Sequence, residues 1–488
     1  MTKKNGTALP DSQPAFEVYI HPIVIHWFRR DLRIDDNTAL AAALRTGMPV
    51  MPIFIFDSTI LDKLEDKNDR RVTFVADQLA GLDKFFRERG GALRVYFGRP
   101  ADIFRRLFSE NTIAAVFCNE DYEPYARERD TEIAKLAAAL SSRFVAVKDH
   151  VIFSPAEVIK DDGSPYQVFT PYSRRWIEKF SAQLPVIALE LPRGEFMPAP
   201  PDLRLLSLAD IGFMRNPAEF PAAKIDESLI ANYDKTRDRP ALAGTSRLGM
   251  HLRFGTISVR YLALRAYELN HKYLAELIWR EFYQMILWFF PQTVSRPFRE
   301  AYAKLKFPGS RSDFEIWCRG ETGYPLVDAG MHELTETGFM HNRVRMVAAS
   351  FLTKHLLCDW RWGERFFARH LNDFELASNV GGWQWCAGIG ADAAPYFRIF
   401  NPSEQQKKFD PQGDYVARWN GRADDLFGTP MDTTPEEVRA QGSRRRSVDT
   451  MSEGARSQGW RQRPEMVPMI DHRFARERCL KFFSAVRP

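Results

Sequence analysis

The sequence predicts a two-domain protein of mixed class, in which an α/β domain built on a doubly wound parallel sheet precedes an all-α domain. Over residues 20–150, apolar strand patterns alternate with amphipathic helix patterns. A long linker is expected over residues 151–225, because prolines gather between Pro185 and Pro221. Over residues 226–488, long helical patterns dominate and strand patterns nearly vanish.

The elements of the α/β domain begin after a polar lead. Five short apolar runs predict strands, at Ile23–Phe28, Val50–Phe56, Leu93–Phe97, Ala114–Cys118 and Phe144–Val147. Four amphipathic stretches predict helices, near Thr38–Arg45, Arg71–Arg89, Pro100–Ser109 and Ala126–Ser141. Because a helix separates every two successive strands, we expect the strands to pair in parallel.

The second half is predicted to be helical almost throughout. The longest patterns with helical spacing cover Val259–Leu269, Leu274–Phe289 and Asn342–Leu357. The polar stretch Gly428–Arg463 predicts a loose surface excursion, and His472–Val486 predicts a final helix.

The composition is that of a globular protein, with 45% hydrophobic and 27% charged residues. A net charge of +5 is a weak argument for nucleic acid binding, so any such surface must come from local clusters of arginine and lysine. The five cysteines lack C-x-x-C spacing, which indicates reduced intracellular thiols. Without a membrane-length apolar run, a signal sequence or metal-ligand spacing, we expect a soluble cytoplasmic protein with no metal site.

A dinucleotide fingerprint is missing where the first strand should lead into it. The turn after Ile23–Phe28 has the sequence Arg29-Arg30-Asp31-Leu32-Arg33 and contains no glycine. The one G-x-G-x-x-A match, Gly388 to Ala393, follows a helical pattern and not a strand. This disfavours a nicotinamide-dependent oxidoreductase.

The segment from Asn379 to Trp385 carries the strongest chemical signal. It combines an amide, two glycines and two indoles, with Arg345 and Asp373 upstream. An amide is neither acid nor base at neutral pH, and paired glycines let a planar group approach the backbone. Indoles add stacking surface and a route for single electrons. This combination suits a flavin beside a flat substrate and suits hydrolysis poorly.

Two further groups carry weaker signals. Thr245-Ser246-Arg247-Leu248-Gly249 supplies hydroxyls and a guanidinium that suit a diphosphate, although a Thr-Ser pair is more often a helix N-cap. Arg345 and Asp373 suit a buried pair whose carboxylate accepts from a flavin N–H, and an ordinary ion pair between helices is the alternative.

Two pairs of residues predict a half-polar, half-aromatic pocket. Glu276 and Trp279 are three apart, and Asn342 and Met346 are four apart, so each pair shares one helical face. Such side chains hydrogen-bond pyrimidine edges and stack on their faces. The alternative is a core stripe with capped polar residues.

Eight motifs in a fixed order resemble the DNA photolyase/cryptochrome family over about Ile23 to Arg422 and again near the end. They are His26-Trp-Phe-Arg-Arg-Asp-Leu-Arg33, Gly244-Thr-Ser-Arg-Leu248, Glu276-Leu-Ile-Trp-Arg-Glu-Phe282, Gly323-Tyr-Pro325, Met340-His-Asn-Arg-Val-Arg-Met346, Gly381-Gly-Trp-Gln-Trp385, Asp392-Ala-Ala-Pro-Tyr-Phe-Arg-Ile-Phe-Asn-Pro402 and Met469-Ile-Asp-His-Arg-Phe-Ala-Arg-Glu-Arg478. The resemblance implies an N-terminal antenna domain and a C-terminal helical domain that binds FAD.

The resemblance also implies roles for individual residues. Positions similar to FAD contacts are Tyr233, Thr245, Ser246, Arg247, Leu248, Arg345, Asp373 and Glu375, with Asn379 facing flavin N5. The lining of the lesion pocket corresponds to Glu276, Trp279, Asn342, Met346 and Trp385, and DNA contacts correspond to Arg237, Arg398 and Gln405. Catalytic roles fall on Glu276, Asn342, Met346 and Asn379. Trp383 and Trp360 resemble the inner tryptophans that carry electrons to the flavin.

Three departures from the family pattern stand out. Phe307 replaces the outer tryptophan of the electron-transfer chain, and Trp317 is our candidate for a substitute terminus. Gly249 replaces a serine in the phosphate loop, and the stretch from Gly421 to Arg463 lacks the usual Ile-His-x-Pro-Trp run.

The resemblance is greatest to a cyclobutane pyrimidine dimer (CPD) photolyase of class I or class III type, acting as a monomer on a dimer flipped out of DNA. The alternative is a cryptochrome photoreceptor. Asn379 favours repair, because an aspartate there would protonate the flavin radical. Asn342 and Met346 stand where (6-4) photolyases carry histidines, which favours CPD. The antenna is a folate or a deazaflavin, and we favour 5,10-methenyltetrahydrofolate.

Overall fold

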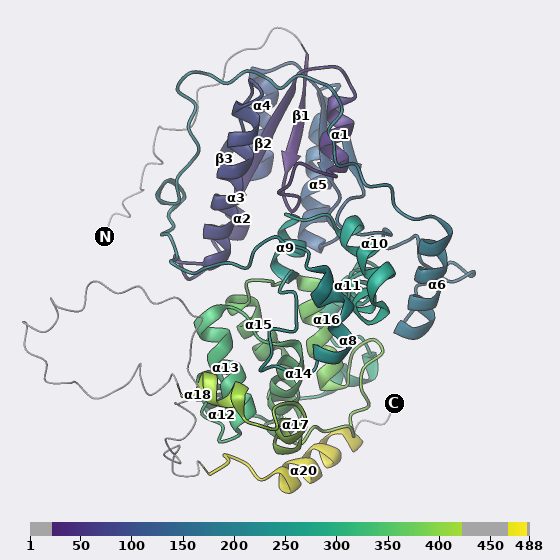
Figure 1. Ribbon diagram of the computed structural model, residues 1–488, viewed down its shortest axis with the longest axis vertical. Coiled ribbons are helices and arrows are strands. Elements are labelled where there is room, and N and C mark those ends of the chain that lie inside the picture. Colours follow the sequence, from purple (N-terminus) through teal and green to yellow (C-terminus); the bar gives the residue numbers. More distant parts are fainter. Residues whose placement is uncertain (1–21, 422–466, 486–488) are drawn as a thin grey trace, which may run out of the picture.

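A computed structural model describes residues 22–421 and 467–485 of the chain. It consists of an α/β domain and a helical domain stacked along the long axis of the molecule (Figure 1). The expected excursion at Gly428–Arg463 lies outside the described residues.

The α/β domain contains the predicted parallel sheet of five strands. Their order is β3-β2-β1-β4-β5, which is the doubly wound order. The direction in which successive strands are added to the sheet reverses at β1, so β1 and β4 flank the switch point. The strands are β1 (Ile23–Phe28), β2 (Val50–Asp57), β3 (Arg94–Gly98), β4 (Ile113–Asn119) and β5 (Arg143–Val147). All five predicted strands are confirmed, each end shifted by one residue at most. Buried β-branched and aromatic side chains on both faces of the sheet explain why the strands could be predicted as continuous apolar runs.

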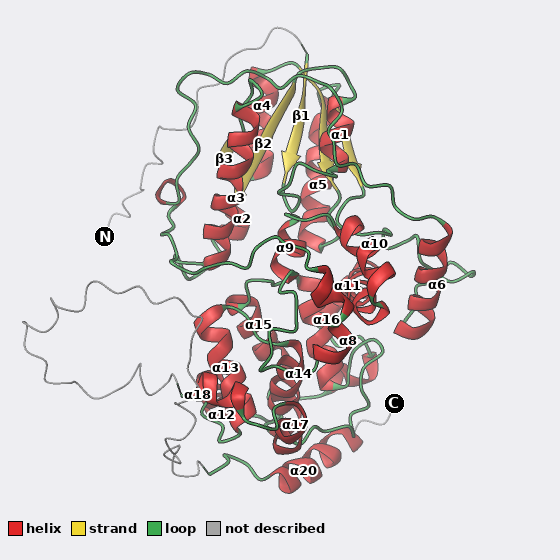
Figure 2. Cartoon of the chain, viewed as in Figure 1, coloured by secondary structure: helices red, strands yellow, loops and turns green. Residues whose placement is uncertain are grey.

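Helices cover both faces of the sheet (Figure 2). They are α1 (Thr38–Leu44), α2 (Ser58–Leu61), α3 (Arg70–Arg87), α4 (Pro100–Glu110) and α5 (Pro124–Ala139). Helices α1 and α3 share a core with Val24 and Phe28 of β1. Helices α4 and α5 share another with Ile25 and Trp27 of the same strand. The alternation along β1 therefore places its side chains in two cores, and only the short α2 was not predicted.

The segment expected to be a linker is more ordered than predicted. Residues Phe169–Ala182 form helix α6, which packs on the helical domain through the fully buried Trp176. Farther along lies a short 3-10 turn at Ala209–Ile211. The proline-rich part follows the sheet, where Val50 N–H donates to Glu195 and Met197 N–H donates to Val50. Proline blocks regular structure in this segment but does not keep it from packing.

The helical domain contains the helices α7 (Glu227–Ala231), α8 (Tyr233–Thr236), α9 (Gly249–Phe254), α10 (Val259–Leu269), α11 (His271–Phe289), α12 (Arg311–Arg319), α13 (Pro325–Thr337), α14 (Asn342–Ser350), α15 (Trp360–His370), α16 (Leu376–Ala387), α17 (Pro402–Phe409), α18 (Asp414–Asn420) and α20 (His472–Ser484). Short 3-10 turns lie at Pro291–Val294 and Glu300–Lys304. The predicted helix Asn342–Leu357 is in fact α14 followed by a π-helical turn, Phe351–His355. None of the helices within residues 22–421 and 467–485 is both long and apolar enough to cross a membrane.

The two domains are locked together by the turn that lacks the glycine fingerprint. Gly255 of the helical domain has φ +63°, and a Cβ there would overlap the carbonyl oxygen of Arg30. Close approach and a left-handed backbone both demand glycine here. The turn Arg29–Arg33 therefore contacts the helical domain directly, and its role is to hold the two domains together.

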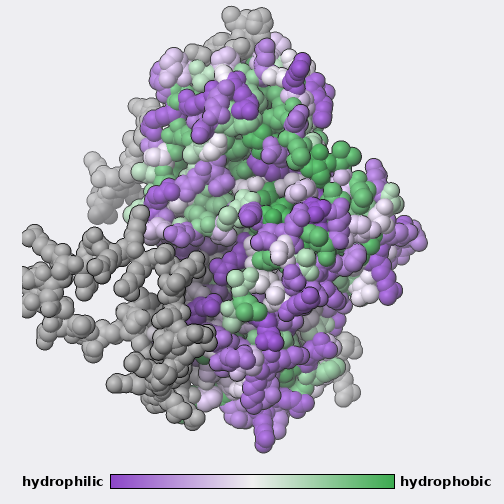
Figure 3. All heavy atoms as spheres, in the orientation of Figure 1, coloured by the Kyte–Doolittle hydropathy of each residue, from purple (hydrophilic) through white to green (hydrophobic). Residues whose placement is uncertain are grey.

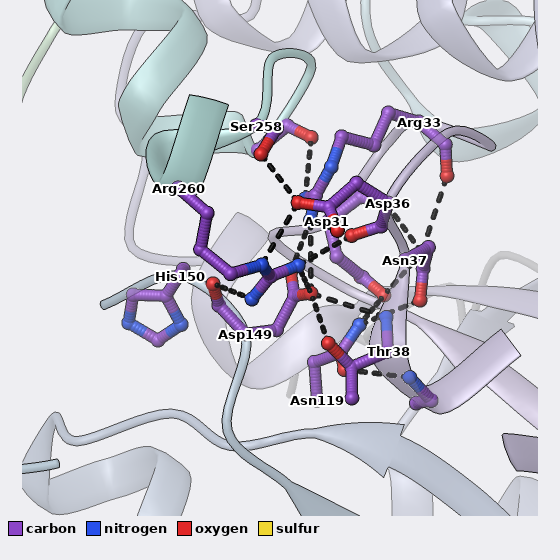
Figure 4. A network of polar contacts seen from close by, with 12 residues as sticks. Asp31, Arg33, Asp36, Asn37, Thr38, Asn119, Asp149, His150, Ser258 and Arg260 are labelled. Carbon is purple, nitrogen blue, oxygen red and sulfur yellow. Dashed lines mark hydrogen bonds and ion pairs between the residues drawn. The ribbon is translucent and has the colours of Figure 1, made fainter. Parts of the chain in front are cut away.

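A polar network next to this contact fixes the domains further (Figure 4). Arg260 of α10 reaches Asp36 at 2.8 Å and Asp149 at 2.9 Å, and Arg33 pairs with Asp149 at 2.8 Å. Burial alone would raise the pKa of the Asp149 carboxyl, but Arg33 and Arg260 lower it well below its usual range. The buried carboxylate is therefore ionised and holds one arginine from each domain.

Candidate functional site

A cavity of about 370 Å³ opens between α11, α14 and α16 of the helical domain. We call it the main cavity. It is lined by these predicted site residues: Arg237, Glu276, Trp279, Asn342, Arg345, Met346, Asp373, Glu375, Asn379, Trp383 and Trp385. The residues that share helical faces in the sequence therefore line one cavity. All four residues of the two pairs line the cavity, although Trp279 and Met346 also pack against hydrophobic cores.

Helix α14 presents Asn342, Arg345 and Met346 to the main cavity at intervals of three and four residues. His341 caps this helix, where its Nδ1 accepts from the Arg343 N–H at 3.1 Å. Burial and nearby Arg345 lower the pKa of His341 to about 4. His341 therefore has a structural role as the N-cap of α14 and is neutral at pH 7.

Helix α16 forms a second wall through Asn379, Gly382 and Trp383. The Asn379 amide nitrogen donates to the Glu364 backbone oxygen at 3.0 Å and to its carboxylate at 2.9 Å. Both amide hydrogens are thus occupied, which leaves the carbonyl oxygen of Asn379 as an acceptor for a ligand. A Cβ on Gly382 would meet no atom within 4 Å, so this glycine widens the cavity for a flat group.

Arg345 and Asp373 form the predicted ion pair, with Nη2 and Oδ2 2.9 Å apart. Asp373 Oδ1 is buried and accepts no hydrogen bond from the described part of the chain. A buried carboxylate oxygen without a donor is costly, and a ligand N–H would satisfy it. A Cβ on Gly249 would lie 2.8 Å from Asp373 Oδ2, so the departure at residue 249 gives the backbone room beside this carboxylate.

The loop Thr245–Leu248 and Tyr233 lie outside the lining of the main cavity, although Gly249 brings the loop against Asp373. The Ser246 hydroxyl hydrogen-bonds the Tyr273 hydroxyl at 2.8 Å, and the rings of Tyr233 and Tyr273 are 5.0 Å apart. Neither Thr245 nor Ser246 is an N-cap, since Leu248 occupies that position on α9. Arg247 has φ +52° and lies over the Phe339 ring.

Glu375 is bound by arginines that sequence reasoning did not include in the site. Arg280 Nη2 lies 3.0 Å from its Oε1, and Arg30 of the α/β domain lies 2.6 Å from the same atom. Burial alone would raise the pKa of Glu375, but these arginines lower it to about 2. The only sequence signal for Arg30 was its place at the end of a buried strand.

At the mouth of the main cavity, Arg237 Nη1 pairs with Glu276 Oε1 at 2.6 Å. Burial raises the pKa of Glu276, and Arg237 opposes that shift. Arg398 and Gln405 lie outside the cavity lining, Arg398 on the segment between α16 and α17. The Arg398 carbonyl accepts from the buried Lys354 at 2.8 Å.

The expected electron-transfer residues are arranged differently from the sequence prediction. Trp317 is 0% exposed, and its ring centroid lies 6.1 Å from that of Trp383. The prediction of Trp317 as an outer terminus is therefore wrong, because its position ten residues after Phe307 carries no information on depth. Trp360 is also buried, and the Phe307 ring packs against Phe482 at 5.3 Å.

A second cavity, of about 270 Å³, lies at the carboxyl ends of the strands and reaches the helical domain. Its walls include Trp27, Arg29, Phe54, Tyr125 and Phe254. This is the edge at which doubly wound sheets bind ligands. Sequence reasoning missed it, because its walls come from six separate segments.

Comparison with known proteins supports this division of the chain. Residues 24–190 match the DNA photolyase family model, and residues 273–485 match the FAD binding domain of DNA photolyase. The chain belongs to the DNA photolyase family. Its helical half is thus the FAD-binding domain of a photolyase.

Relatives resemble this photolyase over most of its length. The deoxyribodipyrimidine photo-lyase of Synechococcus sp. is 37% identical, over 81% of this chain and 87% of that protein. The corresponding protein of Escherichia coli is 36% identical, over 82% and 89%. The crystal structure of a bacterial class III photolyase from Agrobacterium tumefaciens has 30% identity and a TM-score of 0.77, covering 98% of this chain and 99% of that one.

The main cavity fits the FAD of this family. The free oxygen of Asp373 and the amide oxygen of Asn379 are acceptors on the cavity wall, and flavin rings carry N–H donors. Gly382 leaves space for a planar ring, and Arg345 pairs with Oδ2 of Asp373 at 2.9 Å, which leaves Oδ1 for the ligand.

Proposed function

We propose that this photolyase repairs cyclobutane pyrimidine dimers in DNA under light, with FAD in the main cavity. The observation that carries the proposal is that one cavity holds both sets of residues. Acceptors suited to a flavin, Asp373 and Asn379, share it with Glu276, Trp279 and Met346, which suit a pyrimidine dimer. Cofactor and substrate would therefore meet without intervening protein.

The bound flavin would supply single electrons under light, and this chain's residues would hold the substrate beside it. Trp279 and Trp385 offer indole faces on which the dimer stacks. Asn342 and Glu276 offer hydrogen bonds to the pyrimidine carbonyl and N–H edges. When Glu276 is protonated, its O–H would stabilise the negative charge that develops on the dimer. Met346 fills the remaining apolar contact.

DNA binding would begin at the rim of the main cavity. The dimer must leave the duplex to enter, which costs less for a poorly stacked lesion than for normal bases. Arg237 at the mouth and the exposed Arg398 would neutralise flanking phosphates, with Gln405 as a further polar contact. We propose that the enzyme acts as a cytoplasmic monomer. The face drawn in Figure 3 is largely hydrophilic over the helical domain.

The cryptochrome alternative is distinguished by Asn379. Its amide nitrogen is fixed on Glu364, so the side chain offers the flavin an acceptor and no proton. An acceptor at this position favours a reduced flavin that carries its own N–H, the form that donates electrons to a lesion.

The second cavity is our candidate for the antenna site. The crystal structure of an archaeal photolyase from Sulfolobus tokodaii contains two FAD molecules, with the implication of a novel light-harvesting cofactor. That protein is 29% identical to this chain, with a TM-score of 0.76. The aromatic walls suit a conjugated ring and Arg29 suits an anionic group on the same molecule, which both the folate that we favour and a deazaflavin carry. The absorption spectrum of the purified protein distinguishes these chromophores.

Illumination of the reduced enzyme with defined lesions tests the function. We expect repair of a CPD in an oligonucleotide and little repair of the (6-4) photoproduct. Repair of the (6-4) product alone would contradict the proposal, as would light-dependent signalling states without any repair.

A further inference from the structure

Helix α6, in the segment predicted as a linker, begins with a residue that stacks on the lesion pocket. The Phe169 ring lies parallel to the indole of Trp279, with centroids 3.8 Å apart and 4° between the planes. Trp279 lines the main cavity and Phe169 does not. Phe169 therefore covers the face of Trp279 that points away from the cavity, and the remaining face is available to a substrate.

The other neighbours of Trp279 come from its own helix. Phe282 meets it edge-on at 5.5 Å, and Tyr283 lies tilted at 5.4 Å. Phe169 is the only ring partner of Trp279 among the described residues that comes from outside α11. Without it, one face of the indole would lose its packing, and the side chain would gain freedom to turn.

Helix α6 is fastened so that Phe169 stays in place. Trp176 Nε1 donates to the buried carboxylate of Glu281 on α11 at 2.6 Å, and Phe153 N–H donates to the same oxygen at 3.3 Å. At the start of α6, the Phe169 N–H donates to Asp392 at 3.2 Å. Asp392 belongs to the segment between α16 and α17, which also carries Arg398.

We infer that Phe169 is a positioning residue that sets the plane of Trp279 for stacking on the lesion, and that α6 is thereby part of the substrate site. The inference rests on the proposed function, since it needs a dimer in the main cavity. A preset indole loses less conformational freedom on binding, so part of the lesion affinity comes from a residue that never touches the lesion.

A double-mutant cycle on binding to a CPD-containing duplex tests this inference. We expect Phe169→Ala to weaken CPD binding about 2- to 10-fold, the fold-change that corresponds to one aromatic pair. In the Trp279→Ala background, Phe169→Ala should cause no further loss, because its partner is absent. Affinity for undamaged duplex, FAD content and the rate of flavin photoreduction should stay unchanged in Phe169→Ala.

Conservative variants separate stacking from simple packing. Phe169→Tyr keeps a flat ring and should bind the CPD as the wild type does, whereas Phe169→Leu fills the space without a ring and should bind as weakly as Phe169→Ala. Phe290→Ala is the matched control. Phe290 packs edge-on against Phe298 at 5.0 Å, a pair that includes neither Trp279 nor a residue of α6, so its loss should lower the melting temperature without a loss of CPD affinity.

Two results would refute the inference by itself. They are equal losses from Phe169→Ala with and without Trp279, and wild-type affinity in Phe169→Leu. A wild-type protein that does not prefer CPD duplex over undamaged duplex would instead refute the proposed function, and the inference with it.

Discussion

Glu276 shows how the charge of one residue can be set by its neighbours. Its carboxyl lies at the mouth of the main cavity, where burial raises its pKa and Arg237 opposes the shift. A carboxyl poised in this way can donate to or accept from a pyrimidine edge. If Arg237 binds a phosphate, as we propose, its release from Glu276 would couple the lesion contact to the phosphate contact.

We predict that Glu276→Ala lowers the quantum yield of CPD repair several-fold, because the charge on the dimer loses a hydrogen bond. FAD content should stay at one per chain, since Glu276 lies at the mouth and not beside Asp373. Repair per absorbed photon and the flavin absorbance of the purified variant are the measurements. Loss of FAD from the variant would show that Glu276 is structural instead.

At the residue scale, spacing along the sequence predicted a good part of the site, but it did not predict the contacts between distant segments. Helical periodicity brought Glu276 together with Trp279, and Asn342 with Met346, because positions three or four apart share a face. Arg280 and Arg30 were missed as partners of Glu375, since ion pairs between distant segments leave no local pattern. The resemblance to the family, and not periodicity, linked Asn379 to the flavin.

Among the elements, helix α6 and the positions of the tryptophans were the features predicted least well from the sequence. Periodicity predicted the strands and α11 well, because apolar runs and amphipathic stripes are local. The prolines that follow α6, from Pro185 to Pro221, led us to expect a linker over this helix, although its buried Tyr172, Trp176 and Phe180 lie at four-residue spacing. Trp317 was our candidate for the terminus of electron transfer from its position in the sequence, whereas tertiary packing places it beside Trp383.

The packing of α12 against α16 leads to a prediction on electron transfer. Trp317 is in ring contact with Trp383, and Phe314 lies between it and Trp362, with centroid distances of 5.8 Å and 5.5 Å. Trp362 is half-buried and therefore nearer to solvent than Trp317. Phe314 cannot be an oxidised intermediate, so an electron on this route would pass from Trp362 to Trp317 directly, across the phenylalanine ring. We predict that Trp317→Phe slows photoreduction of oxidised FAD, because phenylalanine is much harder to oxidise than tryptophan.

The comparison variant is Trp360→Phe, which removes the other tryptophan that could reduce Trp383. Photoreduction should be slowest in the double variant. Trp419→Phe, a buried tryptophan on α18, is the matched control and should photoreduce normally. CPD repair from chemically reduced flavin should be equal in all of them. Normal photoreduction in Trp317→Phe would eliminate this route and leave Trp360 as the tryptophan that passes electrons to Trp383.

On the scale of the whole molecule, DNA binding should be governed by salt. Phosphate contacts release counterions, so the logarithm of affinity should fall linearly with the logarithm of salt concentration. We predict that Arg398→Ala reduces the magnitude of this slope by about one, since it removes one phosphate contact. Titrations of duplex at several salt concentrations give the slope. Arg215→Ala is the control, since its side chain is paired with Asp77 on the α/β domain.

Glu375 connects the two domains through charge, and its protonation should govern acid stability. Its carboxylate, from the helical domain, is shared by Arg280 and by Arg30 from the α/β domain. The folded pKa of about 2 lies below the ordinary 4.5, so the stabilisation is complete above pH 4.5 and is lost as the pH falls toward 2. Glu375→Gln leaves the arginines without this charge, and at pH 7 we predict a loss of about 3–5 kcal/mol in the free energy of unfolding.

The difference between wild type and Glu375→Gln should shrink as the pH falls from 4.5 to 3, because the unfolded wild type binds a proton in this range, whereas the folded carboxylate, with a pKa of about 2, does not. Urea unfolding midpoints at pH 7, 4 and 3 measure it, with the slope against urea compared to detect separate unfolding of the domains. Glu178→Gln is the matched control. Its carboxylate pairs with Arg175 on an exposed surface, so its small effect should be nearly the same at every pH. A Glu375→Gln deficit that stays constant down to pH 3 would show that the carboxylate stabilises the domain contact by its shape and hydrogen bonds, and not by its charge.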